Sequence, residues 1–67
     1  MKEHLKELLE KERHRIQTLS DQELVEFCSV IEWEKYEGAE HGIDVEYETL
    51  LLKDIIKLML ERNLTGE

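Results

Sequence analysis

Apolar residues recur along this chain at the three- and four-residue spacing of amphipathic helices, in three separate stretches. In the first stretch, about residues 2–18, Leu5, Leu9 and Ile16 lie on one stripe. Glu12 interrupts the stripe where a coiled coil would need an apolar side chain. The pattern predicts a helix whose narrow apolar face needs a partner surface to persist.

The start of the second helix is the best-marked boundary in the sequence. Ser20 and Glu23 have the spacing of a capping box, in which the hydroxyl and the carboxylate each accept a hydrogen bond from the other residue's backbone N–H. We therefore expect a helix over residues 21–37 that ends near Gly38. Its predicted apolar face is centred on four residues: Leu24, Phe27, Cys28 and Ile31.

The segment that follows is open to two interpretations. Residues 38–42 contain two glycines and should break the helix, and residues 43–48 then alternate apolar with acidic side chains. Alternation with a period of two is typical of a strand, but one short strand has no pairing partner unless a second copy of the chain supplies it. We expect a helical or irregular lead-in capped by Asp44, with the strand as the alternative.

The third helix, predicted over residues 44–63, is the most apolar element, with an apolar arc of roughly 200°. Two narrow neighbouring helices can hardly cover so wide an arc, and an uncovered part would face water as an apolar patch. We therefore expect an all-α fold, a helical hairpin plus an N-terminal helix in one domain, completed by homodimerisation. The predicted oligomer interface consists of Leu51, Leu52, Ile55, Ile56, Leu58 and Met59.

Length and composition support that expectation. With 67 residues, of which 20 are Leu, Ile, Val or Phe, the chain should fold, but a core of this size rarely supplies more than about 5 kcal/mol. Its single cysteine excludes a disulfide within the chain, which leaves a second subunit as the natural reinforcement. No apolar run reaches the ~20 residues that span a bilayer, and the charged start leads to no signal region, so we expect a cytoplasmic protein.

Charge is distributed unevenly along the chain. Residues 20–49 contain ten acidic side chains and a single base, Lys35, so this middle segment carries all of the net charge of −8. Such a segment repels nucleic acid and anionic membranes and favours a partner with a basic surface. Within it, Trp33 falls opposite the apolar face, so it either packs under a neighbouring helix or stands exposed as an anchor for a partner. The candidate partner-binding residues are Trp33, Tyr36, Glu32, Glu34, Glu37 and Glu40.

We find no catalytic constellation in the sequence. Ser20 is explained by the helix cap, and Cys28 lies on an apolar face with no cation near it in sequence to lower its pKa. Glu10 with His14, and Glu37 with His41, have a four-residue spacing that can present two metal ligands, but the Glu-x-x-His spacing of dinuclear carboxylate bundles is absent. We expect neither a metal nor another cofactor.

Residues 19–27, Leu-Ser-Asp-Gln-Glu-Leu-Val-Glu-Phe, resemble a piece of the Hha/YmoA family of small bacterial regulators, which dock on a nucleoid-associated silencer. The same Leu-Ser-Asp start is similar to the sporulation kinase inhibitor Sda, a helical hairpin that docks on a histidine kinase. These resemblances imply a small bacterial or phage regulator that works by binding a protein.

Two functional hypotheses follow from these patterns. The first is an acidic, non-enzymatic regulator or adaptor that docks on a partner protein as a helical homodimer. The alternative is an acidic nucleic-acid mimic that occupies the basic surface of a DNA- or RNA-binding protein, as phage inhibitors do. The concentration of acids in residues 20–49 motivates the second hypothesis.

Overall fold

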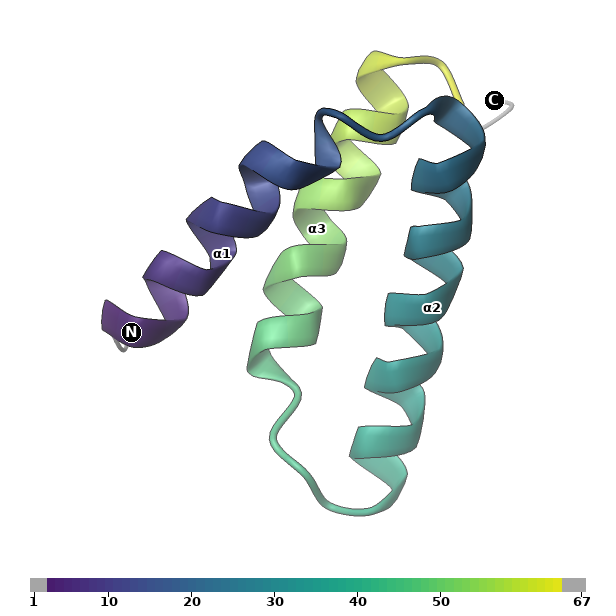
Figure 1. The fold of residues 1–67 in the computed structure, drawn as a ribbon. Coiled ribbons are helices and arrows are strands. Elements are labelled where there is room, and N and C mark those ends of the chain that lie inside the picture. Colours follow the sequence, from purple (N-terminus) through teal and green to yellow (C-terminus); the bar gives the residue numbers. More distant parts are fainter. Residues whose placement is uncertain (1–2, 65–67) are drawn as a thin grey trace.

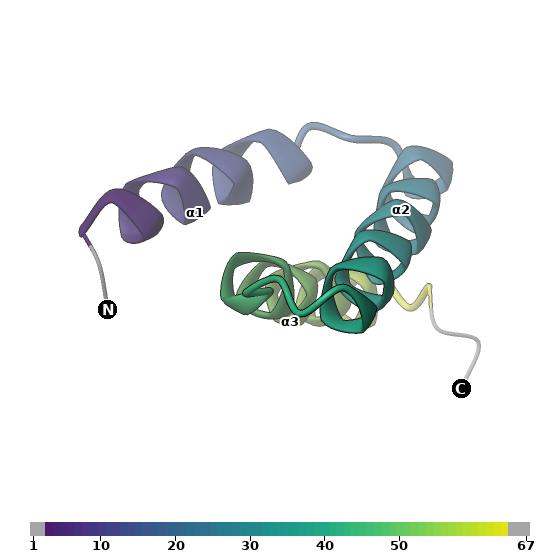
Figure 2. The same cartoon turned by 90° about the horizontal axis from the view of Figure 1, so that it is seen from below.

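The computed structural model describes residues 3–64, which form three helices: α1 (Glu3–Ile16), α2 (Asp21–Glu40) and α3 (Glu46–Glu61) (Figure 1). α2 and α3 run side by side in opposite directions as a hairpin, and α1 packs obliquely on α3 with its N-terminal end turned away from α2 (Figure 1). Seen from below, α1 and α2 lie on either flank of α3 (Figure 2). The predicted all-α, three-helix fold is confirmed; Lys2, at the start of the first predicted helix, lies outside the described residues.

The capping box predicted at the start of α2 is present. The backbone N–H of Ser20 donates to Glu23 Oε1 (2.8 Å), and the backbone N–H of Glu23 donates to Ser20 Oγ (3.1 Å). The two hydrogen bonds satisfy donors that the first helical turn would otherwise leave free. The bond from the Ser20 backbone favours the charged carboxylate and, with the Ser20 hydroxyl, lowers the pKa of Glu23.

The predicted end of α2 near Gly38 is wrong, because the helix continues to Glu40. The backbone instead reverses at Gly42, whose φ of +73° suits a residue without a Cβ. Gly38 serves close packing: a Cβ built on it would lie 2.7 Å from Val45 Cγ1. The missing side chain therefore lets the loop after α2 approach the helix.

The short segment before α3 is irregular over residues 43–45, and no strand occurs among residues 3–64, so the strand alternative is wrong. Asp44 Oδ1 accepts a hydrogen bond from the backbone N–H of Glu46 (2.9 Å). This confirms the lead-in capped by Asp44. The acidic side chains of Glu46 and Glu48 in the first turn of α3 also suit the positive end of the helix dipole.

α3 is the centre of the core, since it packs against both other helices. Some side chains of its apolar arc face α1, and others face α2. Phe27 of α2 extends the packing sideways: the Arg15 guanidinium of α1 lies 4.9 Å from the centre of its ring. Eight side chains are buried in the described part of the chain: Leu9, Ile16, Leu24, Cys28, Ile31, Leu51, Leu52 and Ile55.

The predicted oligomer interface needs correction at three of its six residues. Leu51, Leu52 and Ile55 are buried by this chain's own helices, with exposed fractions of 1%, 9% and 0%. They are core residues, because α1 and α2 sit on different sides of α3 and together cover more of its arc than two parallel neighbours would. Of the other three, Leu58 and Met59 are half-buried and Ile56 is exposed.

Candidate protein-binding surface

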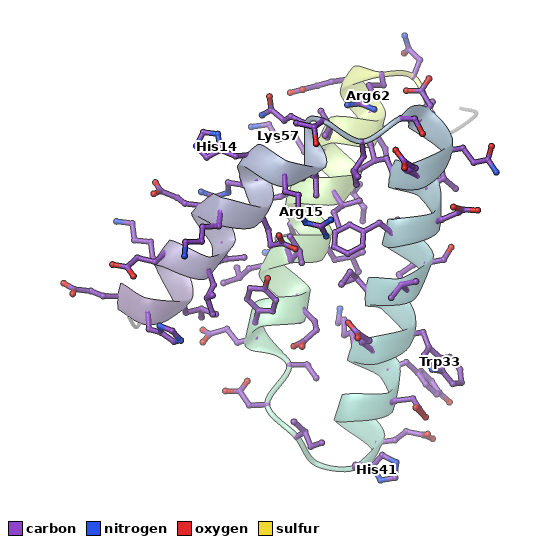
Figure 3. All side chains as sticks on the ribbon, viewed as in Figure 1. His14, Arg15, Trp33, His41, Lys57 and Arg62 are labelled. Atoms are coloured by element: carbon purple, nitrogen blue, oxygen red, sulfur yellow. The ribbon has the colours of Figure 1, made fainter. Side chains whose placement is uncertain are left out.

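The outer side of α2 exposes two aromatic rings. Trp33 and Tyr36 are 61% and 59% exposed, with ring centres 6.3 Å apart and planes within 20° of parallel. Trp33 projects from α2 away from α1 and α3 (Figure 3). Leu24 and Ile31 are buried on the side of α2 that faces the core. Because an α-helix has 3.6 residues per turn, Trp33 lies on the opposite, outer side of α2. Of the two interpretations open for Trp33, the structure shows the exposed one.

Acidic side chains surround the rings. The Tyr36 hydroxyl donates to Glu40 Oε1 (3.4 Å), and Glu32 lines a shallow hollow together with Trp33, Tyr36 and Ser29. We call the six residues predicted for partner binding the aromatic–acidic surface; all six are on α2, and all are exposed. Its members are Trp33, Tyr36, Glu32, Glu34, Glu37 and Glu40.

A second hollow continues this surface towards the loop after α2. Trp33 forms part of its wall, and Ile43, which is 62% exposed, forms another part. Sequence reasoning did not single out Ile43, although its position next to a glycine turn makes an exposed apolar side chain easy to detect. The ionisable groups that line this hollow are Glu34, Glu37, Asp44, Glu48 and His41.

The electrostatics of this surface favour a cationic partner. Lys35 is the single base in residues 20–49, and it is half-buried in the groove against α3, which Glu32, Tyr36 and Glu40 also line. The hollow beside Trp33 that contains Glu34 and Glu37 is lined by no lysine or arginine. A cation that approached Trp33 would be attracted by the carboxylates and by the negative face of the indole ring.

Ser20 and Cys28, the two candidate nucleophiles in the sequence, belong to a helix cap and to the core. Ser20 Oγ accepts the cap hydrogen bond. Burial, with the nearby carboxylate of Glu32, raises the pKa of the Cys28 thiol and keeps it protonated. His14 on α1 and His41 after α2 lie at opposite ends of the molecule (Figure 3), and residues 3–64 contain no group of three or more His, Cys, Asp or Glu side chains placed to hold a metal ion.

Two basic residues of α1, Arg13 and Arg15, are engaged in ion pairs. Arg13 Nε donates to Asp54 Oδ2 on α3 (2.7 Å), and Arg15 Nε donates to Glu12 Oε2 (2.9 Å). The first pair ties α1 to α3, and the second orients Arg15 beside the ring of Phe27. These contacts make Arg13 and Arg15 part of the helix packing.

No model of a known family, no curated protein and no solved structure matches this chain. The likeness of residues 19–27 to the Hha/YmoA family therefore stays a resemblance of one short segment. None of the helices within residues 3–64 combines the length and the apolar character needed to cross a membrane.

Proposed function

We propose that this chain is a non-enzymatic protein-binding regulator, and that it docks on a basic surface of its partner through the aromatic–acidic surface. One observation carries the proposal: Trp33 and Tyr36 stand side by side and well exposed on the outside of α2, among carboxylates. Trp and Tyr are over-represented among the residues that dominate binding energy at protein interfaces. Their rings contribute nothing to this chain's own core, so a role outside the fold explains their position.

The acidic residues and the rings would contribute in different ways. Long-range attraction by Glu32, Glu34 and Glu37 speeds encounter with a basic partner and weakens as salt is added. Burial of the two rings supplies most of the affinity and depends little on salt. Because both rings are fixed on a regular helix, little ordering accompanies binding.

We also propose that the regulator works as a homodimer. Within residues 3–64 eight side chains are buried, which is a small core for a domain that must stay folded. Ile56 and Leu60 are 42% and 56% exposed on α3, although the core takes up most of that helix's apolar arc. A second subunit that covered them would stabilise each copy.

Partner binding can be tested by affinity capture in the cells that naturally produce this protein. The baits are the wild type and the variants Trp33→Ala and Leu8→Ala. Trp33→Ala removes the larger ring, and Leu8→Ala is the matched control, since Leu8 is a 38%-exposed apolar residue on α1. We expect a protein that is captured by the wild type and by Leu8→Ala but lost by about tenfold or more with Trp33→Ala. Equal capture by all three baits would refute the proposal.

The same capture repeated across a salt series tests the acidic contribution. We expect the yield to fall as the ionic strength rises from about 0.05 to 0.5 M, because exposed charges are screened over that range. Glu37→Lys should reduce both the yield and its dependence on salt. If the yield of capture does not change with salt, the proposal that the partner has a basic surface is wrong, and only the role of the aromatic rings remains.

A further inference from the structure

The α2–α3 hairpin has two broad sides, and α1 covers one of them. The ion pair between Arg13 and Asp54, and the contact of Arg15 with Phe27, place α1 on that side. The other side is open within residues 3–64, as the view from below shows at the flank of α2 and α3 away from α1 (Figure 2). We call it the uncovered hairpin face; its residues are Val25, Glu32, Tyr36 and Ala39 on α2, and Leu52, Lys53, Ile56 and Leu60 on α3.

Exposed apolar side chains are concentrated on the uncovered hairpin face. Val25, Ile56 and Leu60 are 40%, 42% and 56% exposed, and Tyr36 lies at its edge. A groove runs between the two helices. It is lined by residues of α2 and by Leu52 of α3. Three of the four large aliphatic side chains exposed on α2 and α3 thus lie on one face, which is the pattern of a surface that another molecule covers.

The charges of this face match a second copy of the same face. Glu32 of α2 lines the groove beside Leu52 of α3. Lys53, the residue after Leu52, is exposed on α3 and therefore lies at a neighbouring level along the helices. A two-fold axis parallel to the helices preserves the level of each residue and places α2 of one copy over α3 of the other. Each Glu32 then faces the Lys53 of the other copy, so the face is complementary to itself.

We infer that a second copy of this chain covers the uncovered hairpin face, with Glu32 of each copy paired to Lys53 of the other. The inference rests on the proposed homodimer and replaces the oligomer interface predicted on the third helix, in which Leu51, Leu52 and Ile55 are buried by this chain's own helices. A basic partner is a poorer occupant here, because it would meet Lys53 and Lys35, whereas the hollow beside Trp33 is lined by no lysine or arginine. The two surfaces share Glu32 and Tyr36, and the dimer leaves both Trp33 rings open to a partner.

The size of the face sets the expected strength of the dimer. The molecule is 32 Å long, and two helices about 10 Å wide give a face of roughly 600 Å². Stable complexes bury about 800 Å² on each partner, so this dimer belongs to the weaker class of interfaces. Because each chain has a net charge of −8, added salt reduces the repulsion between copies and should strengthen the dimer.

Sedimentation of the full chain over a concentration series tests the apolar contact. Ile56→Glu places a charge in the centre of the face, and Ile43→Glu is the matched control, since Ile43 is exposed in the loop before α3. We expect the dissociation constant to rise by at least tenfold for Ile56→Glu and by less than twofold for Ile43→Glu. Equal effects of the two substitutions, or a wild-type chain that stays monomeric at millimolar concentration, would overturn the inference.

A charge exchange tests the register of the two copies. Glu32→Lys and Lys53→Glu should each weaken the dimer about five- to tenfold, and the double variant should return to within about threefold of the wild type. Glu34→Lys, on the flank of α2 that faces α1, makes the same charge change and should not weaken the dimer. A double variant as weak as the single variants would refute the paired register.

The dimer and the partner-binding proposal can fail separately. Trp33→Ala should leave the dissociation constant of the dimer unchanged while it abolishes partner capture. Lys53→Glu lies on α3, outside the aromatic–acidic surface, and should weaken the dimer without changing capture per chain. A Trp33→Ala variant that loses the dimer would place the contact between copies at the aromatic ring and overturn the inferred face.

Discussion

Arg62, just past the end of α3, connects the last helix to the linker between α1 and α2. Its Nη1 donates to the carbonyl oxygen of Leu19 (2.8 Å) and its Nη2 to that of Gln17 (3.1 Å). Nη1 also lies 3.2 Å from Asp21 Oδ1. The guanidinium therefore satisfies two carbonyl groups that follow α1, where no helix continues to bind them.

The contribution of Arg62 to the free energy of unfolding depends on how exposed each of its contacts is. Arg62 is 23% exposed and Asp21 is 67% exposed, so solvent reduces their ion pair to about 0.5 kcal/mol or less. The two carbonyl hydrogen bonds are charge-assisted, and the one to Leu19 is partly buried, although water partly replaces a lost donor. We expect Arg62→Met to lower the free energy of unfolding by about 1.5 kcal/mol, which is roughly 6–12 °C in the melting temperature of a domain this small.

Urea unfolding, followed by far-UV circular dichroism, measures this effect. Asp21→Asn is the control, because it removes the ion pair and leaves both carbonyl bonds, and it should cost about 0.5 kcal/mol or less. The difference between the two variants should persist in about 1 M salt, where surface ion pairs are screened. Equal losses for Arg62→Met and Asp21→Asn would show that the carbonyl contacts contribute nothing, and the reasoning would fail.

Three further predictions concern α2. Leu24→Ala, at a fully buried position, should cost about 2–5 kcal/mol and leave the chain largely unfolded by circular dichroism. Gly38→Ala should destabilise the wild type by about 1 kcal/mol in urea unfolding because its Cβ meets Val45, and should instead stabilise a Val45→Ala background by about 0.5 kcal/mol through helix propensity. Ser20→Ala should cost about 1 kcal/mol. Because the capping box lowers the pKa of Glu23 in the folded state, its contribution is present at neutral pH and lost as the pH falls through that pKa, so acid titrations of wild type and Ser20→Ala should converge.

Local patterns determined most of the fold. The three helices, the cap at Ser20 and the lead-in at Asp44 depend on residues within one or two turns of each other, so the sequence alone located them. The prediction that Gly38 ends α2 failed because its role depends on Val45, a neighbour in space across the turn. From the sequence, Trp33 could be either exposed or packed under a neighbouring helix. The helical period shows on which side of α2 Trp33 lies, but not whether another helix covers that side.

The candidate site divides in the same way. The aromatic–acidic surface lies within one helix, and its six residues could be listed from their spacing alone. The sequence could not separate core residues from exposed residues within the predicted oligomer interface. The apolar arc of α3 has the same composition on the side that faces α1, the side that faces α2 and the side that is open. Leu52 is buried because α2 packs beside it, and Ile56 is exposed because α1 packs on the other side of the hairpin.

The sequence by itself determined that this chain is three amphipathic helices, with most of its excess negative charge and its only tryptophan on the middle one. It could do so because helical period, capping and charge are properties of neighbouring residues. Only the tertiary structure decided that α1 covers one side of the hairpin and leaves the other open. Only it revealed that Arg62 reaches back to Gln17 and Leu19, more than forty residues away. Contacts over such separations depend on the angle at which helices cross, and that angle results from the packing of all three helices together.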